Sequence, residues 1–281
     1  MKKVIALLLG IVMLFALTAC ASKTEPQQTA GSADEAGAEN VTLYVFAAAS
    51  MTETLDQIIA LYQAVAPNVT VVPTYDSSGT LKTQIQEGAA CDIFISAAQK
   101  QMNQLDAARD AEGGNEEGLD FVLSDTRVNL LENKVVLAVP DANPADIQTF
   151  SDLGTEKLTL LCIGNEDVPV GAYSEEILTT LGILDTLEQS GKLTYGSNVK
   201  EVTTQVKEGT VDAGIIYATD AFSAALTVVD EADSSLCKQV IYPAAVLNTT
   251  ENEQAARDFL AFLQSDEAMA IFQSVGFAPA A

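Results

Sequence analysis

The chain has 281 residues, with 14 lysines and arginines against 39 aspartates and glutamates, a formal net charge of −25 and no histidine. So acidic a surface is a poor partner for nucleic acid and for anionic lipid headgroups. The absence of histidine removes the usual base that activates a serine or cysteine nucleophile and the commonest ligand of zinc. These features exclude histidine-dependent hydrolases and argue against nucleic acid as a partner.

Residues 1–19 are predicted to be a signal peptide. Two lysines precede an uncharged apolar run over residues 4–17, which ends at small residues. The run is shorter than the roughly 20 apolar residues that a membrane-spanning helix needs. A short apolar run between basic residues and a small-residue cleavage site is typical of export signals. The alternative interpretation is a retained helical anchor.

Cys20 closes the sequence Leu17-Thr18-Ala19-Cys20. A leucine three residues before the cysteine resembles the lipobox of bacterial lipoproteins, in which the cysteine is lipidated and becomes the first residue. The resemblance implies that Cys20 anchors the protein to the outside of the cell membrane through acyl chains. Residues 20–40 contain no aliphatic side chain larger than alanine, so we expect a lipidated cysteine followed by a flexible tether.

The three remaining cysteines are Cys91, Cys162 and Cys237. Cys91 opens an apolar run and Cys162 lies inside one, which favours buried free thiols. A disulfide between Cys162 and Cys237 stays open, because pairing cannot be deduced from spacing.

From residue 41 onward, short β-type runs alternate with helical patterns, which predicts an α/β architecture with mainly parallel sheets. The expected strands are 41–47, 69–75, 91–97, 133–140, 158–163, 193–195, 213–217 and 238–247. Helices are expected between them wherever apolar residues recur at helical spacing, as Leu55, Ile58 and Tyr62 do, and in the tail over residues 259–275. The charged, glycine-rich residues 108–118 are expected to form a surface loop.

Four loops share one pattern, in which a strand ends, small or hydroxyl residues follow, and a helix begins at once. The unpaired N–H groups and the dipole of a helix start can bind an anion without a charged side chain. Ligands of parallel sheets also gather at the carboxyl ends of the strands. The loops are residues 46–53, 75–81, 164–173 and 197–199.

The candidate donors in and near these loops are two hydroxyls, two backbone amides and one phenol. The hydroxyls are those of Ser50 and Ser78, the amides are those of Val170 and Val199, and the phenol is that of Tyr217, at a strand end. The three side chains each have a structural alternative. Ser50 with the glutamate three residues later fits a capping box, Ser78 fits an ordinary turn, and Tyr217 fits a strand-end aromatic residue.

Taken together, these loops resemble the periplasmic molybdate-binding proteins of ABC transporters. The match extends over residues 41–278 and includes seven short motifs: FAAASMT at 46–52, SSGTL at 77–81, DIFISA at 92–97, VPVGAY at 168–173, GIIYATDA at 214–221, YPAAV at 242–246 and GF at 276–277. The resemblance implies a two-lobed type II periplasmic-binding-protein fold. Lobe 1 would comprise residues 41–132 plus 243–281, and lobe 2 would comprise residues 133–242, with the ligand in the cleft between them.

In that family the oxyanion is held by two serines, two backbone amides and a tyrosine, which match Ser50, Ser78, Val170, Val199 and Tyr217. The resemblance therefore implies an extracytoplasmic monomer without a cofactor or bare metal ion. It would capture molybdate or tungstate and deliver the anion to the permease subunits of an ABC transporter. Molybdate and tungstate are nearly equal in size and charge, and the sequence does not rank them.

Two alternatives remain. The first is a binding protein of the same fold for another anion, such as sulfate or an organic acid. Binders of carboxylates usually use an arginine, and the three arginines of the chain lie outside the four loops, which favours an inorganic oxyanion. The second is a serine-dependent hydrolase with Ser50 or Ser78 as nucleophile, for which Lys82 is a poor base unless its side chain is buried.

The donor set also predicts selectivity. We expect no carboxylate beside the anion, so that a fully deprotonated dianion finds only donors. Hydrogen phosphate would then bury an O–H without an acceptor, at a cost of about 1–3 kcal/mol. Sulfate would be disfavoured by its size.

Overall fold

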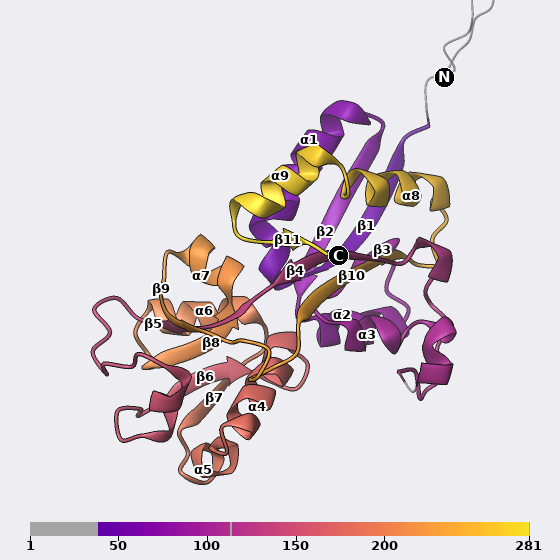
Figure 1. Cartoon of the computed structure of the whole chain (residues 1–281). Coiled ribbons are helices and arrows are strands. Elements are labelled where there is room, and N and C mark those ends of the chain that lie inside the picture. The colour runs from indigo at the N-terminus through magenta and orange to yellow at the C-terminus, as the bar shows by residue number, and fades with distance from the viewer. Residues whose placement is uncertain (1–38, 113, 281) are drawn as a thin grey trace, which may run out of the picture. The chain divides into compact units, whose positions relative to one another are not determined.

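The computed structural model describes residues 39–112 and 114–280 (Figure 1). Three predicted features lie outside these residues: the signal peptide, the lipidation site Cys20 and all but the last two residues of the tether. Within the described ranges, no helix combines the length and apolarity that crossing a membrane requires.

Lobe 1 is built on a six-stranded sheet with the order β11-β4-β10-β3-β1-β2. Its strands are β1 (Val41–Ala48), β2 (Val69–Asp76), β3 (Ile93–Ile95), β4 (Val128–Asn133), β10 (Val240–Val246) and β11 (Ala278–Pro279). Its α-helices are α1 (Thr52–Val65), α2 (Ser78–Gln86), α3 (Gln99–Asn103), α8 (Glu253–Phe262) and α9 (Asp266–Ser274). Three short 3-10 helices, η1 (Ala49–Met51), η2 (Ala107–Glu112) and η3 (Ser124–Thr126), complete it.

Lobe 2 is built on a five-stranded sheet with the order β7-β6-β8-β5-β9. Its strands are β5 (Val135–Val139), β6 (Leu161–Gly164), β7 (Leu193–Gly196), β8 (Ala213–Tyr217) and β9 (Thr227–Glu231). Its helices are α4 (Pro169–Thr180), α5 (Leu184–Gln189), α6 (Val199–Lys207), α7 (Ala218–Ala224) and the 3-10 helix η4 (Phe150–Gly154).

The expected α/β architecture with two lobes is confirmed, but the sheets are mixed where mainly parallel sheets were expected: the described strands form four parallel and five antiparallel pairs. In each lobe, parallel strand pairs are joined through helices, as in β1 with β2 and β3, and in β6 with β7 and β8. Antiparallel pairs occur beside the crossings, where β10 runs against β3 and β4, and β5 runs against β8 and β9. The parallel strands bring their carboxyl ends to one edge of each sheet, which is where the predicted loops lie.

The chain passes between the sheets twice. It leaves the first sheet at the end of β4, enters the second at the start of β5, and returns between β9 and β10. The lobe boundaries expected from the sequence, 41–132 plus 243–281 and 133–242, stay a prediction about which residues move together.

The C-terminal helices pack on lobe 1. Figure 1 shows α9 beside α1, and the ring centroids of Tyr62 on α1 and Phe259 on α8 are 4.8 Å apart. The predicted apolar face of α1 is confirmed, because Leu55, Ile58 and Tyr62 are buried against this core.

Two local expectations need correction or completion. Residues 107–112 form the helix η2 where a loop was expected, because Asp106 accepts a hydrogen bond from Ala108 N and is itself held by Arg127.

Cys91, Cys162 and Cys237 are free and buried, so the possible disulfide between Cys162 and Cys237 is not formed. Burial raises the pKa of the Cys162 thiol to about 12, which keeps it in the unreactive neutral form at neutral pH.

Candidate functional site

The predicted loops of both lobes meet around one small cavity. Its volume is about 10 Å³, which is room for the centre of about one water molecule. The cavity is lined by Ala48, Ala49, Ser50, Asp76, Ser77, Ser78 and Ala97 from lobe 1, and by Val168, Pro169, Val199 and Tyr217 from lobe 2. Four of the five predicted site residues are in this lining, and the fifth, Val170, follows the lining residue Pro169 directly.

Ser50 lies in the 3-10 turn that links β1 to α1, and its side chain is buried. Its hydroxyl is 2.8 Å from the hydroxyl of Tyr242, on β10. The capping-box alternative is wrong, because α1 begins after Met51 without a side-chain cap and the side chain of Glu53 turns to Lys200. The Ser50 hydroxyl does not cap a helix and is therefore available to a ligand in the cavity that it lines.

Ser78 is the first residue of α2 and is fully buried. The neighbouring Ser77 caps the helix, since its hydroxyl accepts a hydrogen bond from Thr80 N at 3.1 Å. The Ser78 hydroxyl accepts from Ala97 N at 3.0 Å, and therefore keeps its own proton to donate. Within the described residues, no acceptor is found for the Ser78 backbone N–H.

The two predicted amides of lobe 2 open helices. Pro169 occupies the first position of α4, so the N–H of Val170 is the first that the helix offers. Val199 opens α6 after Asn198, whose side chain caps the helix by accepting from Glu201 N. Neither the Val170 nor the Val199 N–H has an acceptor in the part of the chain that the structure describes, so both remain available to an anion.

Tyr217 ends β8 and is buried. Its phenol donates to the carbonyl oxygen of Ala97 across the lobes, over a long distance of 3.4 Å. Burial, with the nearby Tyr242, raises the pKa of Tyr217 well above its usual value, so the phenol stays protonated. Tyr217 can therefore act only as a neutral hydrogen-bond donor or acceptor in this cavity.

The expectation that no carboxylate contacts the anion stays a prediction, although one carboxylate lies nearby. Asp76, at the end of β2, lines the cavity. Its Oδ1 accepts from Ser77 N at 2.7 Å and lies 3.4 Å from Asn198 Nδ2 in the other lobe. These donors offset part of its charge.

Sequence reasoning also missed the side chains that orient Ser50. Tyr242 OH accepts from Asn133 Nδ2 at 3.2 Å, and the same amide group donates to Thr219 Oγ1 at 2.9 Å. Tyr242 belongs to a matched family motif, which is the one signal that pointed to it. Asn133 lies where the chain crosses from the first sheet to the second, so this network connects the site with that crossing.

The two lobes are in direct contact over the cavity. The backbone N–H of Gly79 donates to the carbonyl oxygen of Asp167 at 2.9 Å. A Cβ at position 79 would lie 2.5 Å from that oxygen, so only glycine fits this approach. The described conformation is thus a closed one.

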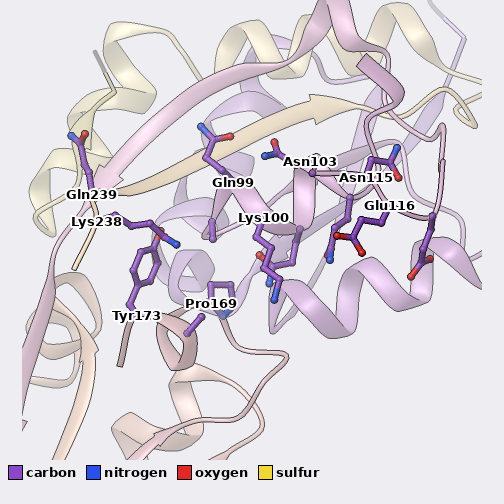
Figure 2. A pocket seen from close by; sticks show the side chains of 15 residues that line it. Gln99, Lys100, Asn103, Asn115, Glu116, Pro169, Tyr173, Lys238 and Gln239 are labelled. Carbon is purple, nitrogen blue, oxygen red and sulfur yellow. The ribbon is translucent and has the colours of Figure 1, made fainter. Parts of the chain in front are cut away.

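A larger cavity of about 620 Å³ lies beyond Pro169 (Figure 2). Figure 2 shows that it is bordered by Gln99 and Asn103 of α3 and by Tyr173 of α4. Two of its amide side chains are engaged within the protein, because Arg127 donates to both Gln99 and Asn103. None of the five predicted donors lines it, so the small cavity is the better candidate site.

Two α/β lobes closed over a cavity of hydrogen-bond donors define a two-lobed solute-binding protein. In agreement, residues 43–278 match the family described as bacterial extracellular solute-binding protein. The chain belongs to this family.

Known proteins resemble this chain over most of their length. A Bacillus subtilis protein assigned as an ABC transporter substrate-binding lipoprotein is 36% identical over 242 residues, covering 85% of this chain and 87% of that protein. The molybdate-binding protein ModA of Haemophilus influenzae is 33% identical over 245 residues, covering 85% and 91%. The solved substrate-binding domain assigned to a molybdenum ABC transporter of Clostridium difficile has 34% identity and a TM-score of 0.63, covering 86% and 100%.

Proposed function

We propose that the protein captures molybdate, or the closely similar tungstate, outside the cell and delivers it to the permease of an ABC transporter. The observation that carries this proposal is the gathering of donors from both lobes around one small cavity. The ModA relative named above is a molybdate-binding protein, which supports the same cargo.

The chemistry of the donor set fits a small dianion. Two hydroxyls, the free N–H groups of helix starts, and a phenol that would turn from the Ala97 carbonyl oxygen can all donate to a bound anion. Hydrogen bonds to a charged partner contribute about 1.5–3 kcal/mol each. Among the residues that the structure describes, no lysine or arginine lines the cavity, so we infer that neutral donors and helix dipoles hold the anion. Local donors of this kind overcome the repulsion that a net charge of −25 exerts on an anion.

Replacing Ser78 by alanine tests the proposal. Calorimetric titration should show one molybdate per wild-type chain, and Ser78→Ala should weaken binding by about one to two decades, the cost of one hydrogen bond to a charged ligand. Ser265→Ala is the matched control, because Ser265 caps α9 and does not line the cavity. It should lower stability and leave affinity unchanged. Equal affinity of Ser78→Ala and wild type would contradict the proposed site.

Asp76 supports one alternative cargo. A carboxylate beside the cavity can accept a hydrogen bond from the O–H group of an oxyanion such as hydrogen phosphate. Molybdate carries no O–H group at neutral pH. Sulfate and organic acids remain alternatives of the same class. Titration of each anion distinguishes them from molybdate.

We also propose that Cys20 carries a lipid and alone anchors the protein to the outer face of the membrane. The lipobox-like sequence supports this, as does the lipoprotein name of the Bacillus subtilis relative. In a host that processes lipoproteins, Cys20→Ala should move the protein from the membrane to the soluble fraction with unchanged molybdate affinity. Continued membrane association of the variant would contradict the anchor.

A further inference from the structure

Three charged side chains form a network beside the candidate site. The ammonium of Lys200 lies 2.8 and 2.7 Å from the two carboxylate oxygens of Glu53, and 3.1 Å from Oδ1 of Asp220. Each of the three residues stands within three positions of a predicted anion donor in the sequence. When one lobe moves, the charged side chains on that lobe therefore move together with the neighbouring anion donors.

The network crosses from one lobe to the other. Glu53 lies in the first turn of α1 in lobe 1, whereas Lys200 and Asp220 lie in the first turns of α6 and α7 in lobe 2. The pair of Lys200 with Asp220 is internal to lobe 2. The pair of Lys200 with Glu53 requires that the two lobes be together.

Lys200 is the ion-pair partner of a buried carboxylate. Asp220 is fully buried, and neither of its carboxylate oxygens has a hydrogen bond within the described residues; the contact to Lys200 is an ion pair without hydrogen-bond alignment. Although the burial of Lys200 opposes its charge, Asp220 and Glu53 together raise its pKa above the usual value. The ammonium therefore stays charged and fixed between two carboxylates.

We propose that Lys200 is a positioning residue that latches the two lobes over the bound anion, by pairing with Glu53 only in the closed conformation. This inference rests on the proposed function. Glu53, Lys200 and Asp220 do not line the cavity. The latch acts on the closed state, so its loss should speed release of the anion and leave capture almost unchanged.

The test measures how fast molybdate is captured and released. Isotopically labelled molybdate is released into an excess of unlabelled molybdate, and association is followed separately. In Glu53→Gln, release should be about two- to fivefold faster, as expected for a partly exposed ion pair, with the association rate constant within about twofold of wild type. Lys200→Met should release at least as fast as Glu53→Gln, and Lys200→Arg should restore slow release.

A double variant and a control separate a latch from a general loss of structure. Glu53→Gln combined with Lys200→Met should release no faster than Lys200→Met alone, because Glu53 acts through Lys200. Lys207→Met should behave as wild type, since Lys207 is exposed at the far end of the same helix and forms no ion pair within the described residues.

The outcomes distinguish the latch from the cargo. If Glu53→Gln and Lys200→Met release molybdate at the wild-type rate, the latch proposal is overturned and the proposed cargo is unaffected. If the wild type binds another oxyanion in place of molybdate, the proposed cargo is wrong and the same comparison with that anion decides the latch. Absence of binding to any oxyanion overturns both.

Discussion

At the scale of single residues, two neighbouring serines divide two tasks. Ser77 caps α2, and this leaves the hydroxyl of Ser78 to accept from Ala97 N and to present its proton toward the cavity. Either serine fits a helix cap by composition alone, so the sequence could not assign the tasks. The position at which the helix begins decides between them.

Gly79 provides a test of closure at this scale. In Gly79→Ala, the new Cβ would lie 2.5 Å from the carbonyl oxygen of Asp167 in the other lobe, and the lobes could not close fully. Overpacking of this kind costs about 1–3 kcal/mol, so molybdate affinity should fall by about tenfold or more.

The ligand-free variant provides the control. Because alanine is the better helix residue by about 0.5–1 kcal/mol, the thermal stability of ligand-free Gly79→Ala should be unchanged or slightly higher. Unchanged molybdate affinity in Gly79→Ala would show that the contact with Asp167 is not needed for binding.

Several site residues could not be predicted because their partners are far apart in the chain. Tyr242 and Asn133 are 109 positions apart, and Lys200 and Glu53 are 147 positions apart. A local pattern predicts a strand end or a helix start, and this was enough to find Ser50, Ser78, Val199 and Tyr217 around one cavity. Asp76 belongs to the predicted loop 75–81, but its place in the cavity lining depends on how β2 ends beside the other lobe, which no local pattern encodes.

At the scale of elements, the strands that lead into the site follow clear sequence patterns, whereas β4, β9 and the two-residue β11 were missed. β4 has two adjacent buried leucines, Leu130 and Leu131, because it lies between β10 and β11 and is covered on both faces. The alternation expected of a half-buried strand is therefore absent. β9 is an edge strand with mostly exposed side chains and too few apolar residues to stand out.

The first turn of α7 makes a pH-dependent contribution to stability. Burial raises the pKa of Asp220 from 3.8 to about 6, although Lys200 partly opposes the shift. The folded state thus holds this proton more tightly than the unfolded state, and the associated stability is lost as pH rises from about 4 through about 6.

Asp220→Asn should remove this pH dependence. The free energy of unfolding of the variant, relative to wild type, should increase by about 2 kcal/mol between pH 4 and pH 7. Urea unfolding at several pH values measures the difference, in which the contributions of the other carboxyl groups cancel. A difference that does not change with pH would mean that Asp220 titrates normally.

At the scale of the whole molecule, a strongly acidic protein binds an anion by enclosing it. The two crossings of the chain lie near Asn133 and Val240, and we expect the lobes to rotate about them as the cleft opens and closes. The donors come from both lobes, so only the closed protein can surround the anion. Tight binding and slow release are therefore expected to depend on contacts between the lobes as well as on the donors themselves.

Competition calorimetry with four oxyanions, at fixed salt and neutral pH, tests the central claim most directly. Molybdate and tungstate should bind far more tightly than sulfate, whose shorter bonds leave the donors too distant, and sulfate should bind no worse than hydrogen phosphate. Asp76 Oδ1 is already engaged by Ser77 N and Asn198 Nδ2, so we expect the phosphate proton to be buried without an acceptor, at a cost of about 1–3 kcal/mol. Phosphate binding as tightly as molybdate would mean that Asp76 accepts that proton, and would contradict the proposed cargo.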